Sequence, residues 1–180
     1  NSVYRNTDLG RREYQAVDLQ SSYRLGSSLM VNGQWTVQLE NDGNFEGEAA
    51  SNPAIPSLIG DYPEIYIAER SFPMGRLDDF QRHTVRVWAN YSFDLHGYGQ
   101  LDVAPLYRYN SPRTFSLAAA SVPLTAQQTA ANPGYVRLPA GQPLFFGLRG
   151  SQEFEDFALF DLGVTYGVPV WQSVTPWVKL

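Results

Sequence analysis

The sequence contains no cysteine among its 180 residues, which excludes disulfide bonds, zinc–thiolate sites and a cysteine nucleophile. Charge is also scarce, because only 17% of the residues are charged, against about 25% in an average soluble domain. Lysine and arginine number 13 against 18 acidic residues, and no basic tract is present, so we expect no nucleic-acid partner. No apolar run approaches the roughly 18 residues of a transmembrane helix.

Apolar and polar residues alternate along most of the chain. The sequence is 43% hydrophobic and 14% aromatic, which is not the composition of a disordered chain. Between Leu29 and Glu40 the alternation is broken only at Met30, with Gly33 counted on the apolar side. A period of two residues indicates β-strands with one apolar face. The sequence therefore predicts an all-β fold, an antiparallel up-and-down meander of about six strands, at about 12–25, 28–40, 83–94, 99–110, 156–168 and 174–180.

The predicted strands are joined by connections of two kinds. Short turns follow the first, third and fifth strands, whereas long segments at about 41–79 and 111–155 follow the second and fourth. Loops longer than about 12–15 residues are unusual in compact domains. In a meander this order places both long segments at one end of the sheet, which is typical of outer-membrane β-barrels. We therefore expect 41–79 and 111–155 to be extracellular loops.

Aromatic residues gather near both ends of the predicted strands. Tyr23, Tyr91, Phe93, Tyr166 and Trp171 lie near the short turns, and Trp35, Tyr107, Tyr109 and Phe157 lie near the long segments. Two such bands are typical of the aromatic girdles at the two membrane interfaces. A strand of about ten residues, tilted by about 45°, rises roughly 24 Å, close to the height of a barrel's apolar band. We expect the chain to be part of a larger transmembrane barrel, because single-chain barrels have at least about eight strands.

The alternation assigns the strand side chains to two faces of the predicted barrel wall. The residues expected to face lipid are Val31, Trp35, Val37, Val85, Val87, Leu101, Val103 and Val164. The residues expected to face the lumen are Asp18, Arg24, Gln34, Gln38, Arg86, Asn90, Asp102 and Arg108. For the lumen-facing residues two roles remain open, contact with a plug or solute, and a hydrogen-bonded network within the wall. The network is favoured, because most such groups meet protein or water.

Several segments resemble a known family. They are Tyr14–Gln20, Tyr23–Leu25, Asn44–Glu48, Asp61–Glu64, Asp79–Ala89, Tyr107–Ser111, Asn132–Tyr135, Phe145–Gly150, Asp156 and Asp161–Leu162. The most specific of them is Asp79-Phe80-Gln81-Arg82-His83-Thr84-Val85-Arg86-Val87-Trp88-Ala89. Together they resemble the C-terminal barrel region of TonB-dependent outer-membrane receptors, in particular the Oar-like group, over about residues 12–180.

This resemblance implies a wall segment of a transporter in the bacterial cell outer membrane. Complete members of the family carry a plug, a TonB-contacting motif and about twenty-two strands. The implied partners are outer-membrane lipid, the remainder of the barrel and its plug, the TonB system through an N-terminal part, and an extracellular solute. The implied function is energised movement of a large solute across the outer membrane, and the long loops would determine which solute is bound.

No group of residues in the sequence indicates catalysis, a cofactor or a bound metal. His83 and His96 are expected at opposite ends of one strand. The oxygen ligands and glycines clustered at 41–48 leave calcium binding open, but they lack the spacing of an EF-hand, so a solvated loop tip is favoured. The carboxylates of Glu153, Glu155, Asp156 and Asp161 come with no sign of the cleft that glycoside hydrolysis needs. We therefore expect no enzyme activity and a charged loop base at these acidic residues.

A rival interpretation is a soluble carbohydrate-binding β-sandwich. In a sandwich the aromatic residues would form a core and a sugar-stacking face. The two interpretations differ in what covers one set of side chains, namely Val31, Trp35, Val37, Val85, Val87 and Leu101. A sandwich requires a second sheet over them, whereas a barrel wall leaves them as a continuous exposed belt.

Overall fold

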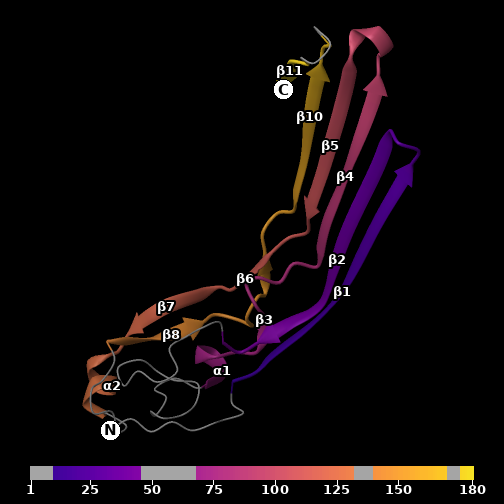
Figure 1. Cartoon of the computed structure of the whole chain (residues 1–180). Coiled ribbons are helices and arrows are strands. Elements are labelled where there is room, and N and C mark those ends of the chain that lie inside the picture. The colour runs from indigo at the N-terminus through magenta and orange to yellow at the C-terminus, as the bar shows by residue number, and fades with distance from the viewer. Residues whose placement is uncertain (1–9, 46–67, 132–139, 170–174) are drawn as a thin grey trace, which may run out of the picture. The chain divides into compact units, whose positions relative to one another are not determined.

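A computed structural model describes residues 10–45, 68–131, 140–169 and 175–180 of the chain (Figure 1). The chain forms two compact units. Among the described residues, the sheet unit comprises those of Ala16–Gln38, Gln81–Pro112 and Glu155–Leu180, and the connection unit comprises the others. In the part of the chain that the structure describes, no helix is long and apolar enough to cross a membrane.

The main sheet contains six strands in sequence order. They are β1 (Arg12–Leu25), β2 (Leu29–Gly43), β4 (His83–Asp94), β5 (Gln100–Asn110), β10 (Phe157–Gly167) and β11 (Trp177–Lys179), and each pairs with the next. A seventh strand of the same sheet, the two-residue β3 (Gly75–Arg76), lies off this order and pairs with β2. Neighbouring strands run in opposite directions (Figure 1). The prediction of an all-β, antiparallel meander is therefore confirmed. Strand β2 continues beyond the expected end at Glu40, because Asp42 and Gly43 pair with β3.

Short turns connect successive strands at one end of the sheet (Figure 1). Gly26, with a φ of 60°, begins the turn between β1 and β2, a backbone conformation that glycine adopts without steric cost. The turn between β4 and β5 contains a single 3-10 turn, η1 (His96–Tyr98). The carboxylate of Asp94 accepts a hydrogen bond from the backbone N–H of His96 at 2.8 Å and so closes the start of this turn.

The register of the ladder sorts the side chains into two faces. Across β2, β4, β5 and β10, one face carries Trp35, Val85, Tyr109 and Ala158 in one row, then Gly33, Val87, Tyr107 and Phe160, and near the turns Leu29, Tyr91, Val103 and Val164. The other face carries Gln34, Arg86, Arg108 and Leu159, then Asn32, Trp88, Leu106 and Asp161. We call these the apolar face and the polar face. They arise because successive side chains of a strand point to opposite sides.

The two long segments expected as loops contain short elements of their own in the connection unit. These are α1 (Ala68–Ser71), β6 (Thr114–Phe115) paired with β9 (Gln152–Glu153), β7 (Ala118–Pro123) paired with β8 (Gly141–Phe145), and α2 (Ala126–Ala131). Phe72, Leu77 and Phe80 are buried and form a small core. The segments are therefore not irregular throughout, because strand pairing within 111–155 and this core order the chain.

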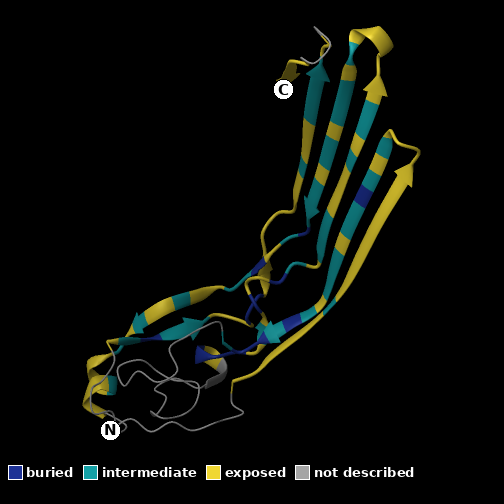
Figure 2. Cartoon of the chain, in the orientation of Figure 1, coloured by how far each residue is buried: buried dark blue, intermediate teal, exposed yellow. Residues whose placement is uncertain are grey.

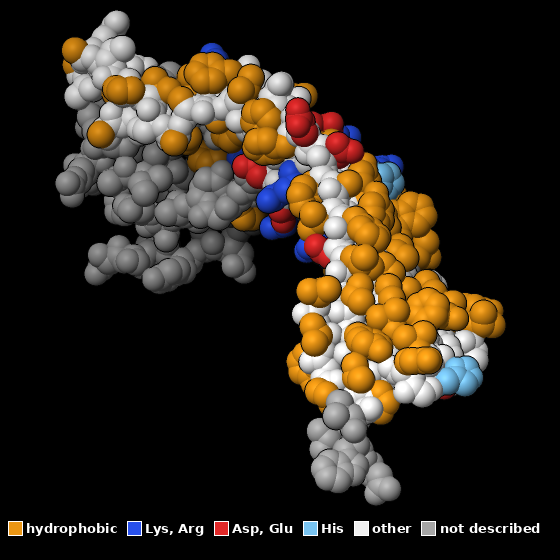
Figure 3. All heavy atoms as spheres, turned by 90° about the horizontal axis from the view of Figure 1, so that it is seen from above, with side chains coloured by type: hydrophobic (Ala, Val, Ile, Leu, Met, Phe, Trp, Pro, Cys, Tyr) orange, Lys and Arg blue, Asp and Glu red, His pale blue; other side chains and the backbone are white. Residues whose placement is uncertain are grey.

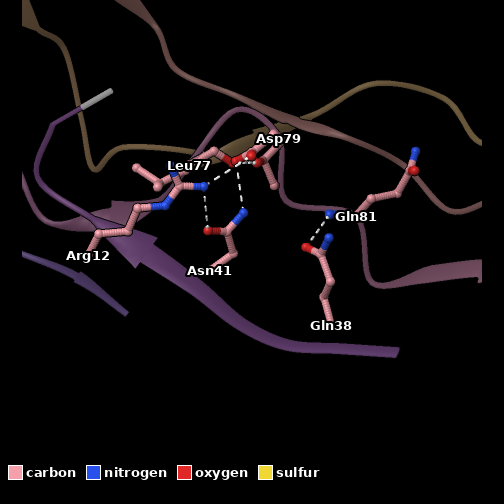
Figure 4. Close-up of polar contacts among 7 residues, drawn as sticks. Arg12, Gln38, Asn41, Leu77, Asp79 and Gln81 are labelled. Carbon is pink, nitrogen blue, oxygen red and sulfur yellow. Dashed lines mark hydrogen bonds and ion pairs between the residues drawn. The ribbon is translucent and has the colours of Figure 1, made fainter. Parts of the chain in front are cut away.

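Buried polar contacts stabilise the connection unit. The guanidinium of Arg149, which is 2% exposed, donates to the carbonyl oxygens of Pro73 at 3.2 Å and Asn44 at 3.0 Å. The Asn41 amide donates to Asp79 at 2.8 Å and accepts from Arg12, which also donates to Asp79 (Figure 4). Such groups are stable in the interior because their polar atoms are hydrogen-bonded.

We predict that Leu77→Ala destabilises the connection unit by about 2–5 kcal/mol, since Leu77 is fully buried and its removal leaves a cavity. Hydrogen exchange at the amide of Phe80, which bonds to the Leu77 carbonyl, would accelerate accordingly. Leu117→Ala is the matched control, because Leu117 is half exposed. Equal acceleration in both variants would contradict the assignment of the core.

Candidate functional site

All eight residues expected to face lipid lie on the apolar face. Trp35 pairs with Val85, Val87 with Tyr107, and Val103 with Val164 in the ladder. Val31 and Val37 lie four residues before and two residues after Trp35 on β2, and Leu101 lies two residues before Val103 on β5, so these spacings are even. The structure therefore brings the whole set together on one surface of a single sheet.

The apolar face has no apolar layer over it among the described residues of the sheet unit. None of the apolar side chains described in this unit is buried. Val87 is 40% exposed, Trp35 42% and Phe160 62%, on three different strands. Figure 2 colours most residues of these strands as exposed or intermediate, and Figure 3 shows hydrophobic side chains gathered over the sheet with few charges among them. Contiguous exposed apolar surfaces occur where proteins contact membranes, other proteins or ligands.

Aromatic side chains lie toward both ends of the apolar face. Tyr91 and Phe93 near the short turns make an edge contact with ring centroids 4.2 Å apart. Toward the other end, the indole N–H of Trp35 donates to Nδ1 of His83 at 3.4 Å. Trp171 lies outside the described residues.

Phe157 does not belong with the other aromatic residues expected near the long segments. It pairs with Asn110, whose other partner is Thr84, so Phe157 lies on the polar face. Phe160, opposite Tyr107, lies on the apolar face instead. The period of two counted from Val164 back to Phe160 already places Phe157 on the other side, because its spacing from Val164 is odd.

The residues expected to face the lumen share the polar face. Gln34, Arg86 and Arg108 form one row of the ladder, and Asp102 is opposite Ser92. Asn90 is opposite Met30, the residue at which the alternation of β2 is broken. On β1, Asp18 accepts a hydrogen bond from Thr36 of this face, and Arg24 follows at an even spacing.

Hydrogen bonds tie only part of the polar face together. Ser92 and Gln100 both donate to Asp102, and Arg108 forms an ion pair with Asp161 at 2.8 Å. The side chain of Gln38 accepts from the backbone N–H of Gln81 at 3.1 Å (Figure 4).

Other polar side chains of this face have no such bond. Within the described residues, the side chains of Arg24, Gln34, Arg86 and Asn90 make no hydrogen bond or ion pair. The polar face is therefore a partial network with free donors and acceptors, rather than a closed one.

The carboxylates considered for chemistry are engaged in separate ion pairs. Asp161 pairs with Arg108, and Glu153 pairs with Arg76 at 3.4 Å in the connection unit. In the part of the acidic stretch 41–48 that is described, the Asn41 amide is occupied by Arg12 and Asp79. Among the described residues no group of three or more His, Cys, Asp or Glu side chains is arranged to hold a metal ion.

One carboxyl of the connection unit has a perturbed pKa. Desolvation raises the pKa of Glu40, and the negative charges of Glu13 and Asp42, with a hydrogen bond shared with Glu13, raise it further. Because the folded-state pKa lies above the unfolded value, folding favours protonated Glu40. The stability that this provides is present at acid pH and is lost as the pH rises through the folded-state pKa.

Sequence reasoning did not single out two features of the polar face. Leu106 and Leu159 lie among polar residues there, opposite Trp88 and Arg108. Asn32 is only 8% exposed although it belongs to a strand of a single-layer sheet. Its burial depends on the register that places it opposite Trp88, which the sequence does not reveal.

Comparison of this chain with protein-family models, curated proteins and solved structures found no match.

Glu40→Gln is predicted to raise the thermal unfolding midpoint at pH 7, because it removes an ionised group that the fold disfavours. The advantage should vanish near pH 4, where the carboxyl of the unfolded chain also becomes protonated. Melting curves in detergent micelles at the two pH values measure this. Glu155→Gln, at an exposed carboxyl, is the control, and an advantage for Glu40→Gln that persists at acid pH would refute the explanation.

Proposed function

We propose that this chain is a barrel-wall and extracellular-loop segment of a TonB-dependent outer-membrane transporter of the Oar-like kind, which moves a large solute across the bacterial outer membrane. The observation that carries the proposal is the uncovered apolar face of a single-layer antiparallel meander. A lipid bilayer covers such a face without a second protein layer.

The distribution of charge favours lipid as the occupant. The charged side chains of Asp18, Arg86 and Asp161, on three different strands, lie on the polar face. Each row of the apolar face carries at least one valine, leucine or aromatic residue. Lipid-facing and lumen-facing residues alternate in this way in transmembrane barrels.

The edges of the sheet favour a larger barrel. In the described residues β1 and β11 lie at the two edges and each pairs on one side only. In a bilayer an open edge leaves backbone N–H and C=O groups without partners at a cost of several kcal/mol each. Further strands of a closed barrel would pair with both edges.

The resemblance in sequence supplies the finer part of the proposal. Its most specific segment, Asp79–Ala89, leads into β4, where it provides both Val85 and Val87 of the apolar face and Arg86 of the polar face. The TonB system, the plug and the large solute follow from that resemblance. The connection unit would supply the recognition surface, and no chemistry is catalysed.

A carbohydrate-binding sandwich receives less support. It requires a second layer over Val31, Trp35, Val37, Val85, Val87 and Leu101. The described residues of the sheet unit form one layer, and none of these six side chains is buried.

Val87→Arg places a charge in the middle of the proposed lipid-facing belt and should cost about 2–4 kcal/mol of stability in a bilayer. Asn90→Arg is the matched control, because Asn90 lies on the same strand but on the polar face. Urea unfolding of both variants in phospholipid vesicles gives the comparison. If the two variants lost the same stability, the proposed lipid-facing surface would be wrong.

A further inference from the structure

A shallow depression opens on the polar face between β1, β2 and β4. Its walls are the side chains of Gln20, Ser22, Asn32, Gln34 and Trp88, and its volume is about 330 Å³. Gly33 of β2 lies beside it, and a Cβ at this position would meet the hydroxyl oxygen of Ser21 at 3.1 Å. The volume is that of a small ligand-binding pocket.

The amide of Asn32 is the first sign of a binding site. Asn32 is only 8% exposed, and its side chain makes no hydrogen bond with any described residue. Its amide atoms are not among the buried side-chain atoms without a partner in the described part of the chain, so they are open to solvent. Because this amide lines the depression, a molecule in the depression can bond to it.

Trp88 is the second sign. It breaks the alternation of β4 and places a large aromatic ring among polar residues, opposite Asn32 on one side and Leu106 on the other. It is 37% exposed, and its indole N–H has no hydrogen-bond partner in the described part of the chain. Aromatic rings with one free face and a free N–H are typical of binding surfaces.

The other side chains that line the depression indicate which class of ligand it binds. Gln20, Ser22 and Gln34 offer amide and hydroxyl groups, and no charged side chain lines the depression. Sugar rings combine an apolar C–H face, which stacks on an aromatic ring, with hydroxyls that bond to neutral amides. Arg86 lies next to Gln34 in the ladder but is not part of the walls.

We propose that this depression binds one neutral sugar ring of an oligosaccharide, with Trp88 stacking on the ring and the Asn32 and Gln34 amides bonding its hydroxyls. The inference rests on the proposed function and names the class of solute that meets the polar face of the wall. The absence of charge from the walls favours a neutral sugar over an acidic one.

The test is calorimetric titration of the full chain in detergent micelles with maltohexaose, cellohexaose, mannohexaose and hexagalacturonate. At least one neutral hexaose should bind, and more tightly than the acidic hexagalacturonate. Trp88→Ala should weaken that binding about tenfold or more, the scale at which truncation of a central tryptophan acts. Asn32→Ala should also weaken it, whereas Trp177→Ala, at an exposed tryptophan outside the depression, should not.

Trp88→Phe keeps an aromatic ring and so controls for the possibility that Trp88→Ala fails to fold. Circular dichroism checks the fold of every variant. Trp88→Phe should bind more tightly than Trp88→Ala. The inference is overturned if no neutral hexaose binds at millimolar concentration, if hexagalacturonate binds best, or if Trp88→Ala binds as well as the unchanged chain. Failure of the proposed function would show separately, as equal stability of Val87→Arg and Asn90→Arg in vesicles.

Discussion

The backbone hydrogen-bond ladder that joins β2, β4, β5 and β10 is the interaction on which the sheet unit depends. Because no described apolar side chain of this unit is buried, a hydrophobic core of its own does not hold the strands. The ladder fixes the register, and the register places Val85 beside Trp35 and Arg86 beside Gln34. A slip of one residue in the register would exchange the two faces. The stability of this register therefore depends on the surroundings of each face.

The connection unit is stabilised by different interactions. Phe72, Leu77 and Phe80 are buried, and the guanidinium of Arg149 is enclosed by carbonyl oxygens and the ring of Phe145, 4.6 Å away. This unit is built on a small core and buried polar contacts, as a water-soluble structure is. The same chain therefore contains one unit with its own core and one whose apolar side chains are not buried among the described residues. The proposed loops and wall of a membrane barrel would differ in this way.

The positions of the strands and their two faces could be predicted from the sequence, because period-two alternation is a local pattern. The short elements within 41–79 and 111–155 could not, since the two-residue strands β6 and β9 carry no periodicity and pair across a long stretch of chain. The burial of Arg149 could not be predicted from the sequence either, because its hydrogen-bond partners Pro73 and Asn44 are distant in sequence.

Only part of the depression at Trp88 could be predicted from the sequence. The break in the alternation at Trp88 could be read from β4 alone. Asn32, in contrast, becomes important only once the register places it opposite Trp88. Barrel membership and solute transport remain proposals, which the resemblance in sequence and the uncovered face support.

The most direct measurement is a scan of single spin-labelled cysteines along β4 in phospholipid vesicles, which the absence of native cysteine makes possible. The membrane-wall proposal predicts that labels at Val85, Val87 and Ala89 collide with lipid-soluble oxygen. Labels at Arg86 and Asn90, which lie on the polar face, should collide instead with a water-soluble nickel chelate. Accessibility to the nickel chelate at every position, or protection from both reagents at Val85 and Val87, would contradict the proposal.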